Sequence, residues 1–328
     1  MGFWTNTRVA VTGGGGFVGS HLVELLVGQG ARVTALDHLG ATQRRNLDAV
    51  WSQVRFDDVD LMQPAASRRV LDGHAVVLHL AANVAGVRFN QAHPATMLRD
   101  NTQLALNVLE AARDAGAERV LMVSSACVYP RFCTIPTPET EGFRDHPEPT
   151  NFGYGWAKRF SELLAQTYAE EFKMRIAVAR PYNAYGPRDH FESPDAHVIA
   201  SLIRRLMDGE NPLTVWGDGT VSRSFVYVTD LARGLLELIE KYPQPDPINL
   251  GTDEEITIRN LAELIVRRSG KRVELQFDPS MPSGQPRRQC DTAKAKALIG
   301  YTARVSLEEG LTNTLAWYEQ HCLASTNR

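Results

Sequence analysis

Residues 12–19 read Thr-Gly-Gly-Gly-Gly-Phe-Val-Gly, and they lie between a β-branched run and an amphipathic one. Residues 8–11 are typical of a strand, and residues 17–28 carry Leu and Val at helical spacings. A glycine turn at such a junction lets a pyrophosphate approach the N–H groups of the first helical turn. We therefore expect a bound dinucleotide here, and its contacts are Gly13, Gly16, Phe17, Val18 and Gly19.

The pattern around this turn predicts an α/β fold. Short β-branched runs alternate with amphipathic stretches, which predicts a parallel, doubly wound sheet with helices on both faces. The predicted strands are residues 8–11, 32–36, 54–56, 76–80, 119–123 and 175–179, and the predicted helices are 17–28, 102–115, 154–172, 197–207, 229–240 and 257–268. We expect residues 1–180, with about 224–250, to form a Rossmann NAD-binding domain. Residues 181–223 and 251–328 would form a smaller, interleaved C-terminal substrate lobe.

Asp37 favours NAD over NADP as the dinucleotide. It ends the second predicted strand, where a carboxylate accepts both ribose hydroxyls and repels a 2′-phosphate. Arg44 and Arg45 follow closely and leave NADP open. Asp58 and Val59, after the third strand, occupy the position of an adenine contact, although Asp58 is equally typical of a loop aspartate.

Tyr154 and Lys158 are one helical turn apart, so the phenol and the ammonium share a helix face. A free tyrosine has a pKa of about 10, so its use as a base near neutrality requires nearby positive charge. Lys158 and a bound nicotinamide would supply that charge. Ser125 follows the fifth predicted strand at the carboxyl edge of the sheet, where it would bond the same substrate oxygen.

Composition excludes several classes of protein. The chain has 35 Lys and Arg against 38 Asp and Glu, a formal net charge of -3, so no basic field is available for nucleic acid. We find no secretory leader and no apolar run of membrane-spanning length, and expect a cytoplasmic protein. Four scattered cysteines favour neither a disulfide framework nor a metal site.

These motifs resemble the extended short-chain dehydrogenase/reductases that act on nucleotide sugars, over nearly the whole chain. The resemblance includes the glycine turn, residues 79–82, Ser125 with Tyr154 and Lys158, and residues 180–187, 223–226, 249–251 and 288–291. It implies cofactor contacts from Leu80, Ala81 and Ala82. It also implies that Asn183, Arg223 and Arg288 hold the substrate diphosphate, although a surface ion pair is a comparable reading of Arg288. A homodimer packed through residues 102–115 and 154–172 is implied as well.

Cys127 and His197 narrow the resemblance. Residues 124–130, Ser-Ser-Ala-Cys-Val-Tyr-Pro, are similar to GDP-mannose 3,5-epimerase and GDP-fucose synthase, and residues 148–154, 186–191 and 196–199 are similar to the latter. Both relatives invert sugar carbons with a cysteine and a second acid or base, which His197 would be here. From the residues alone, a small buried side chain is the favoured reading of Cys127 and a polar helix start that of His197, and only the resemblance favours catalysis for both. Ala126 and Cys127 replace the Asp-Glu pair of the dehydratases, which disfavours dehydration.

The sequence therefore favours an NAD-dependent epimerase of a GDP-mannose-type sugar, with transient oxidation at C4 and inversion at C3, C5 or both. Three alternatives remain open: an epimerase/reductase of a 4-keto sugar, similar to GDP-fucose synthase; a nucleotide-sugar 4-epimerase; and a protein that senses NAD without catalysis. The presence of both Tyr154 and Lys158 argues against the last of these.

Overall fold

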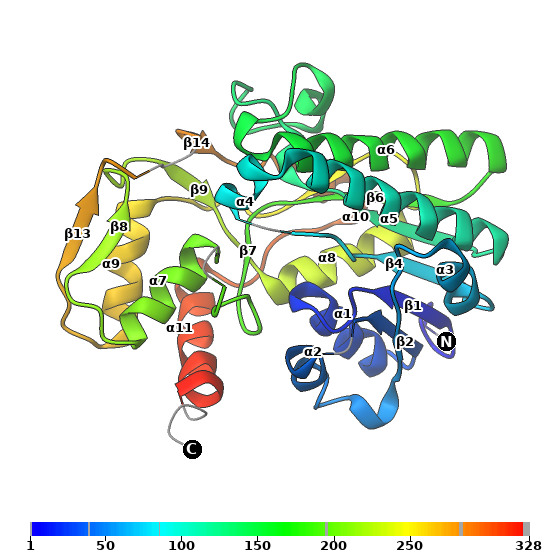
Figure 1. The fold of residues 1–328 in the computed structure, drawn as a ribbon, viewed down its shortest axis with the longest axis horizontal. Helices are drawn as coiled ribbons and strands as arrows, with labels where there is room; N and C mark the ends of the chain where they lie inside the picture. The colour runs from blue at the N-terminus through cyan, green and yellow to red at the C-terminus, as the bar shows by residue number, and fades with distance from the viewer. Residues whose placement is uncertain (1, 39, 85, 194–195, 282–284, 324–328) are drawn as a thin grey trace.

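A computed structural model describes residues 2–38, 40–84, 86–193, 196–281 and 285–323. Its main body is built on a seven-stranded parallel sheet of order β11-β6-β5-β4-β1-β2-β3 (Figure 1). The strands are β1 Arg8–Thr12, β2 Arg32–Asp37, β3 Arg55–Asp58, β4 Val76–His79, β5 Arg119–Val123, β6 Ile176–Pro181 and β11 Ile248–Leu250. Every neighbouring pair is parallel, so the predicted doubly wound sheet is confirmed.

Alternate residues of the inner strands β1, β2, β4, β5 and β6 enter two separate apolar cores. In β1, Val9 and Val11 face one core, whereas Ala10 faces the other. The first core is covered by α1 Phe17–Gly28, α8 Val228–Lys241 and α10 Ala293–Ile299. The second is covered by α3 Pro64–Leu71, α5 Pro94–Asp114 and α6 Phe152–Phe172. Because both faces are covered, the inner strands β1, β4 and β5 are buried almost throughout, whereas the edge strand β3 is mostly charged and partly exposed.

A second body holds a third core, made by α7 Val198–Met207, α9 Ile258–Ser269 and α11 Leu307–Tyr318 (Figure 1). Its strands are β8 Leu213–Trp216, β9 Ser222–Ser224, β12 Glu255–Thr257, β13 Leu275–Asp278 and β14 Arg287–Arg288. The pair β7 Ala184–Tyr185 and β10 Val226–Tyr227 carries the chain between the bodies. Short helices are α2 Ala41–Asn46, α4 Val87–Ala92, η1 Trp51–Gln53, η2 Ala126–Val128, η3 Glu139–Phe143, η4 Pro149–Asn151 and the π-turn Glu319–Leu323.

The predicted elements differ from the structure mainly at their ends. Helix α1 has the predicted bounds, but α5 begins at Pro94 rather than at residue 102. Proline at the first helical position has a suitable φ and needs no N–H partner, so it starts this helix. Strand β11 and helices α10 and α11 were not predicted as elements, because each is short or follows a loop-rich stretch.

The division into two domains stays a prediction, with one amendment suggested by packing. Ala295 and Ile299 of α10 enter the first core, although residues 251–328 were assigned whole to the substrate lobe. Tyr301, which follows α10, lies in the same core. We therefore group residues 293–301 with the main body.

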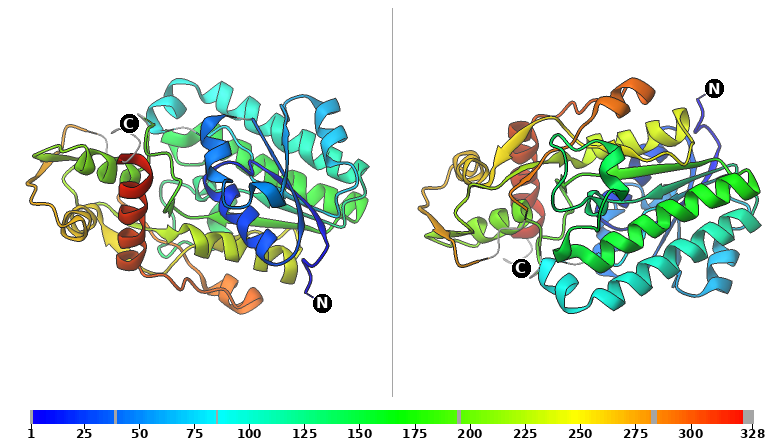
Figure 2. Two further views of the ribbon diagram at one scale, coloured as in Figure 1. Left: turned by 90° about the horizontal axis from the view of Figure 1, so that it is seen from below. Right: turned by 90° about the horizontal axis from the view of Figure 1, so that it is seen from above.

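Helices α5 and α6 lie side by side along the main body (Figure 2). Each has 21 residues. In the described part of the chain, none of the helices combines the length and the apolar character required to cross a membrane.

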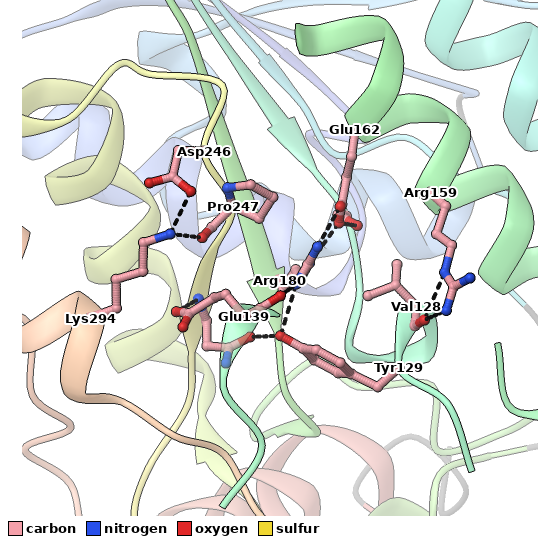
Figure 3. A network of polar contacts seen from close by, with 11 residues as sticks. Val128, Tyr129, Glu139, Arg159, Glu162, Arg180, Asp246, Pro247 and Lys294 are labelled. Atoms are coloured by element: carbon pink, nitrogen blue, oxygen red, sulfur yellow. Dashed lines mark hydrogen bonds and ion pairs between the residues drawn. The ribbon is translucent and has the colours of Figure 1, made fainter. Parts of the chain in front are cut away.

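A buried ion pair joins α6 to the sheet (Figure 3). Nη2 of Arg180, on β6, lies 2.6 Å from Oε2 of Glu162, and the side chains are 2% and 0% exposed. Oε1 of Glu162 also accepts hydrogen bonds from Arg180 and from Ser124. Arg180 donates further to Tyr129 and to the carbonyl of Glu139. The pair thus holds α6, β6 and the segment after β5 in one arrangement.

We expect Glu162→Gln to lower the free energy of unfolding by about 3–5 kcal/mol, because it leaves the Arg180 charge buried without its counterion. The matched control is Asp246→Asn, which removes the partly exposed ion pair of Asp246 with Lys294 in the same region (Figure 3). That change should cost about 0–1 kcal/mol. Urea unfolding monitored by circular dichroism measures both, and equal losses in the two variants would refute the assignment.

Candidate active site

A cavity of about 1040 Å³ extends from the carboxyl edge of the sheet to the second body. Its walls include most of the residues predicted from sequence to bind cofactor, to bind substrate or to act in catalysis. Those residues are Gly13, Gly16, Phe17, Val18, Gly19, Asp37, Val59, Leu80, Ala81, Ala82, Ser125, Cys127, Tyr154, Lys158, Asn183, His197, Arg223 and Arg288. One predicted contact, Asp58, is not in the wall, where Val59 and Asp60 lie instead.

The glycine turn is shaped for close approach of a ligand. Gly13 has φ +68°, which favours glycine, and a Cβ on it would lie 3.0 Å from the backbone nitrogen of Ala81. A Cβ on Gly19 would collide with the carbonyl oxygen of Gly13. Gly16 is the N-cap residue of α1, and no side chain caps this helix. The first-turn N–H groups therefore meet the cavity, as the pyrophosphate of a dinucleotide requires.

Asp37 lies in the cavity wall, beside the place that the ribose of such a dinucleotide would occupy. Its Oδ2 accepts a hydrogen bond of 3.0 Å from the N–H of Gly15, and its Oδ1 accepts one of 2.9 Å from His38. Burial raises the pKa of Asp37, and these hydrogen bonds oppose the rise. The carboxylate is thus fixed to the turn and lines the cavity.

The neighbouring charged residues are engaged elsewhere. Nη1 of Arg44 lies 2.5 Å from Oδ1 of Asp48, and the Arg44 guanidinium lies 3.8 Å from the centre of the Trp51 ring. The carboxylate of Asp58 lies 3.6 Å from Nδ1 of His38 at the surface. The arrangement of Arg44 therefore offers no support for binding a 2′-phosphate.

His79 supports the turn from below, a role that the sequence did not reveal. Oγ1 of Thr12 accepts hydrogen bonds from the N–H groups of Leu80 and Ala81 and lies 2.9 Å from Nδ1 of His79. Burial, with the charge of Lys158, lowers the pKa of His79 to about 3, so the ring is neutral. Because the Thr12 oxygen already accepts twice, its O–H donates to Nδ1 and fixes the path of residues 80–82.

Ser125, Tyr154 and Lys158 meet where β5 ends. Ser125 caps η2, and its Oγ accepts a hydrogen bond of 3.1 Å from the N–H of Cys127. The Ser125 hydroxyl is also hydrogen-bonded to Tyr154. Nζ of Lys158 donates to the carbonyl of Val123 at 2.8 Å and lies 5.5 Å from the centre of the Tyr154 ring. The three side chains thus face one volume.

Burial has the largest effect on the pKa of Tyr154. Burial and then Cys127 raise the pKa of Tyr154, and the hydrogen bond with Ser125 only partly opposes this. Burial also lowers the pKa of Lys158 to about 8. Groups of the chain alone therefore do not make Tyr154 a stronger acid, and the sequence prediction likewise requires a bound nicotinamide beside Lys158. The additional positive charge has to come from a ligand, and an oxidised nicotinamide has it.

Cys127 and His197 reach the cavity from different bodies. Cys127, in η2, is partly buried in the wall next to Ser125. His197 is the N-cap residue of α7, and its side chain is 60% exposed. Its Nδ1 lies 3.9 Å from Oδ1 of Asp189. The structure thus places the two proposed acid/base residues in one cavity.

Arg223 and Arg288 are partners in the register of β9 and β14. Burial and the nearby Arg288 lower the pKa of Arg223 to about 10. Nη2 of Arg288 donates to the carbonyl of Ala126, and Nδ2 of Asn183 donates to the carbonyl of Ser224. Two guanidinium groups on adjacent strands repel each other, and a diphosphate between them would relieve this repulsion.

Sequence reasoning also missed the buried pair of Glu162 and Arg180. Glu162 is four residues after Lys158, on the same face of α6, and a charged residue on a buried helix face is a signal that a partner exists. Among the described residues, no group of three or more His, Cys, Asp or Glu side chains is arranged to hold a metal ion.

Comparisons with known proteins place the chain in a family. Residues 9–251 match the model of the NAD dependent epimerase/dehydratase family. GDP-L-fucose synthase 1 of Arabidopsis thaliana is 32% identical over 320 residues, which cover 95% of this chain and 93% of the relative. The dTDP-4-dehydro-6-deoxy-D-allose reductase of Streptomyces sp is 33% identical, with 97% and 98% covered. GDP-mannose 3,5-epimerase 1 of Oryza sativa subsp. japonica is 29% identical, with 95% and 82% covered.

Solved structures agree. UDP-glucose 4-epimerase of Thermotoga maritima, with UDP-glucose, has a TM-score of 0.87 at 31% identity and covers 95% of this chain and 98% of its own. UDP-glucose 4-epimerase of Thermus thermophilus, in complex with NAD, has a TM-score of 0.83 at 28% identity, with 96% and 100% covered. With its glycine turn, Asp37 and these matches, the chain belongs to the NAD-dependent epimerase/dehydratase family, and its cofactor is NAD.

Proposed function

We propose that this enzyme is a nucleotide-sugar epimerase that oxidises C4 of the sugar transiently and inverts C3, C5 or both, with a GDP-mannose-type sugar as favoured substrate. The strongest support is that one cavity is lined by three sets of residues. These are the glycine turn, then Ser125, Tyr154 and Lys158 with Cys127, and finally His197, Arg223 and Arg288. One bound hexose could therefore reach the cofactor, the residues for oxidation, the second acid or base and the arginines for its diphosphate.

The chain's residues suit a bound NAD. First-turn N–H groups of α1 would hold the pyrophosphate, and the carboxylate of Asp37 would accept the ribose hydroxyls. Leu80, Ala81 and Ala82, held by Thr12, would line the path toward the nicotinamide. When bound, NAD supplies reversible acceptance of a hydride from C4 of the sugar.

Tyr154 would then remove the proton of the C4 hydroxyl through its phenolic oxygen. Ser125, hydrogen-bonded to Tyr154, would bond the same C4 oxygen. With a pKa of about 8, Lys158 is mostly protonated near neutrality, so its charge favours the tyrosinate. The three residues together would stabilise negative charge on the C4 oxygen.

A ketone at C4 acidifies the C–H bonds at C3 and C5, and inversion there needs a base and an acid on opposite faces of the ring. Cys127 comes from the main body and His197 from the second body, which suits work on two faces. Reference pKa values of about 8.5 for cysteine and 6.5 for histidine lie on either side of neutrality, so either residue type serves as base or acid.

Substrate binding is proposed for Asn183, Arg223 and Arg288, with the two guanidinium groups on the diphosphate. The GDP base is favoured because two relatives, by their names, act on GDP sugars. A second candidate is an epimerase/reductase of a 4-keto sugar, which the names of the fucose synthase and the allose reductase favour.

A homodimer is proposed through α5 and α6. Exposed apolar side chains lie along these two helices, namely Leu98, Phe152, Phe160, Leu163 and Phe172. Pairing of the same two helices from a second copy would bury them in a four-helix bundle.

Tyr154→Phe should lower turnover about 100- to 10,000-fold, because the general base is lost. NAD binding should be nearly unchanged, since the phenyl ring keeps its place in the wall. The matched control is Tyr168→Phe on the same helix, where the hydroxyl bonds Glu110 away from the cavity. Discontinuous assays with a panel of sugar nucleotides measure turnover, and fluorescence titration with NAD measures cofactor binding. Near-normal turnover in Tyr154→Phe would contradict the proposed chemistry.

Incubation with GDP-mannose in deuterated water should place deuterium at C3 or C5, as NMR of the recovered sugar reports. Cys127→Ser should strongly lower this exchange, because a serine hydroxyl is too weak an acid to replace the thiol in proton transfer. Cys133→Ser is the control, because the Cys133 thiol is hydrogen-bonded to the Thr137 hydroxyl in a neighbouring loop and has no proposed role in catalysis. Inversion at C4 without label would instead indicate a 4-epimerase, and consumption of added NADH or NADPH in proportion to product would indicate the reductase.

A further inference from the structure

Asp189 is a buried carboxylate that none of the roles above uses. It lies in the loop between β7 and α7, and its side chain is 1% exposed. Oδ1 accepts a hydrogen bond of 2.7 Å from the N–H of His190. Oδ2 is buried and has no hydrogen-bond partner among the described residues. A buried carboxylate with an unpaired oxygen is costly, so it calls for an explanation.

The loop around Asp189 is held firmly against the cofactor helix. Nη2 of Arg188, a residue with φ +69°, lies 2.5 Å from Oε1 of Glu24 in α1. The carbonyl of Pro187 lies 3.0 Å from Nε2 of His21, also in α1. Burial lowers the pKa of His21 to about 4, so its neutral ring donates through Nε2 to this carbonyl. These two contacts hold residues 187 and 188 against α1 and thereby fix the position of Asp189.

His197 is the side chain that faces this carboxylate. The separation of 3.9 Å between Nδ1 of His197 and Oδ1 of Asp189 is that of an ion pair without a tight hydrogen bond. Catalytic hydrogen bonds are often this long before substrate binds and shorten when the site closes. The electrostatic coupling is seen from the carboxylate as well, since burial raises the pKa of Asp189 and protonated His197 opposes the rise.

We propose that Asp189 is a positioning residue that holds the proton of His197 on Nδ1 and thereby presents Nε2 to the sugar carbon. This inference rests on the proposed acid/base role of His197. The nitrogen that carries the proton in a neutral imidazole is set by the hydrogen bond that the other nitrogen makes. With Nδ1–H directed at the carboxylate, Nε2 keeps a lone pair to take a proton. The carboxylate then stabilises the positive ring until Nε2 returns a proton.

His190 is the alternative partner of Asp189 and is distinguishable from His197. Its side chain is exposed, its charge acts on the Asp189 pKa less than that of His197, and the hydrogen bond to the carboxylate comes from its backbone N–H. A change of the His190 side chain therefore leaves that hydrogen bond in place. His190→Asn is thus a matched control for effects on His197.

The direct test is ¹⁵N NMR of the NAD-bound wild-type protein labelled at histidine, with His197 assigned by its loss in His197→Asn. At high pH the neutral His197 ring should carry its proton on Nδ1. In Asp189→Asn, which keeps the oxygen that accepts from His190, the proton should move to Nε2 in a substantial fraction of molecules. A wild-type ring with its proton on Nε2, or a ring unaffected by Asp189→Asn, would overturn the proposal. The wild-type spectrum decides even if the variant does not fold.

Kinetics separate positioning from a structural role. In Asp189→Asn, the exchange of deuterium into GDP-mannose should fall about 100- to 10,000-fold in kcat, as in other sites where the imidazole loses its fixed tautomer. The KM of Asp189→Asn should change little, and the kcat of His190→Asn should be nearly that of the wild type. In a His197→Asn background, Asp189→Asn should lower kcat no further. A fixed Nδ1 proton in a protein that exchanges nothing into any sugar nucleotide would leave the positioning intact and refute the proposed function instead.

Discussion

The ion pair between Glu162 and Arg180 is the constraint on which the site depends. Glu162 is one turn after Lys158 on α6, and Arg180 lies on β6, so the pair sets how the helix sits on the sheet. Oε1 of Glu162 also accepts from Ser124, the residue before Ser125. Because a buried charge without its partner is strongly unfavourable, these elements have one stable arrangement. In that arrangement the phenol of Tyr154 meets the hydroxyl of Ser125.

The proposed chemistry is divided between two bodies. The main body would supply the nucleotide turn and the residues for oxidation at C4, and these are fixed by buried contacts. The second body would supply His197 and the paired arginines, on a smaller core of its own. In this proposal, a substrate that spans both bodies is held at its phosphates by one and at its sugar by both. Such a division lets loops of the second body select the sugar while the redox centre stays constant.

Prediction from sequence worked where the signal was local. The glycine turn, the acid at Asp37 and the i, i+4 spacing of Tyr154 and Lys158 all lie within single elements or between adjacent ones, and the structure brings them to one cavity. Helix α1 had the predicted bounds because its periodicity is uninterrupted. The start of α5 was missed because its first turns, residues 94–101, open with proline and hold few apolar residues at helical spacing, so they resemble a loop. Strand β11 was missed because three residues are too few for periodicity to show.

The sequence by itself determined the fold class, the nucleotide turn and the residue types that can move a proton, since these follow from spacing along the chain. Only the tertiary structure decided which polar, charged and aromatic side chains meet. His79 beneath the turn, Arg44 against Trp51, Arg180 with Glu162 and Asp189 beside His197 are pairs of that kind. Three of these pairs join different elements of the fold, and none has a spacing that a periodic pattern encodes. The raised pKa of Tyr154 has the same origin, because burial depends on everything packed around a side chain rather than on its neighbours in sequence.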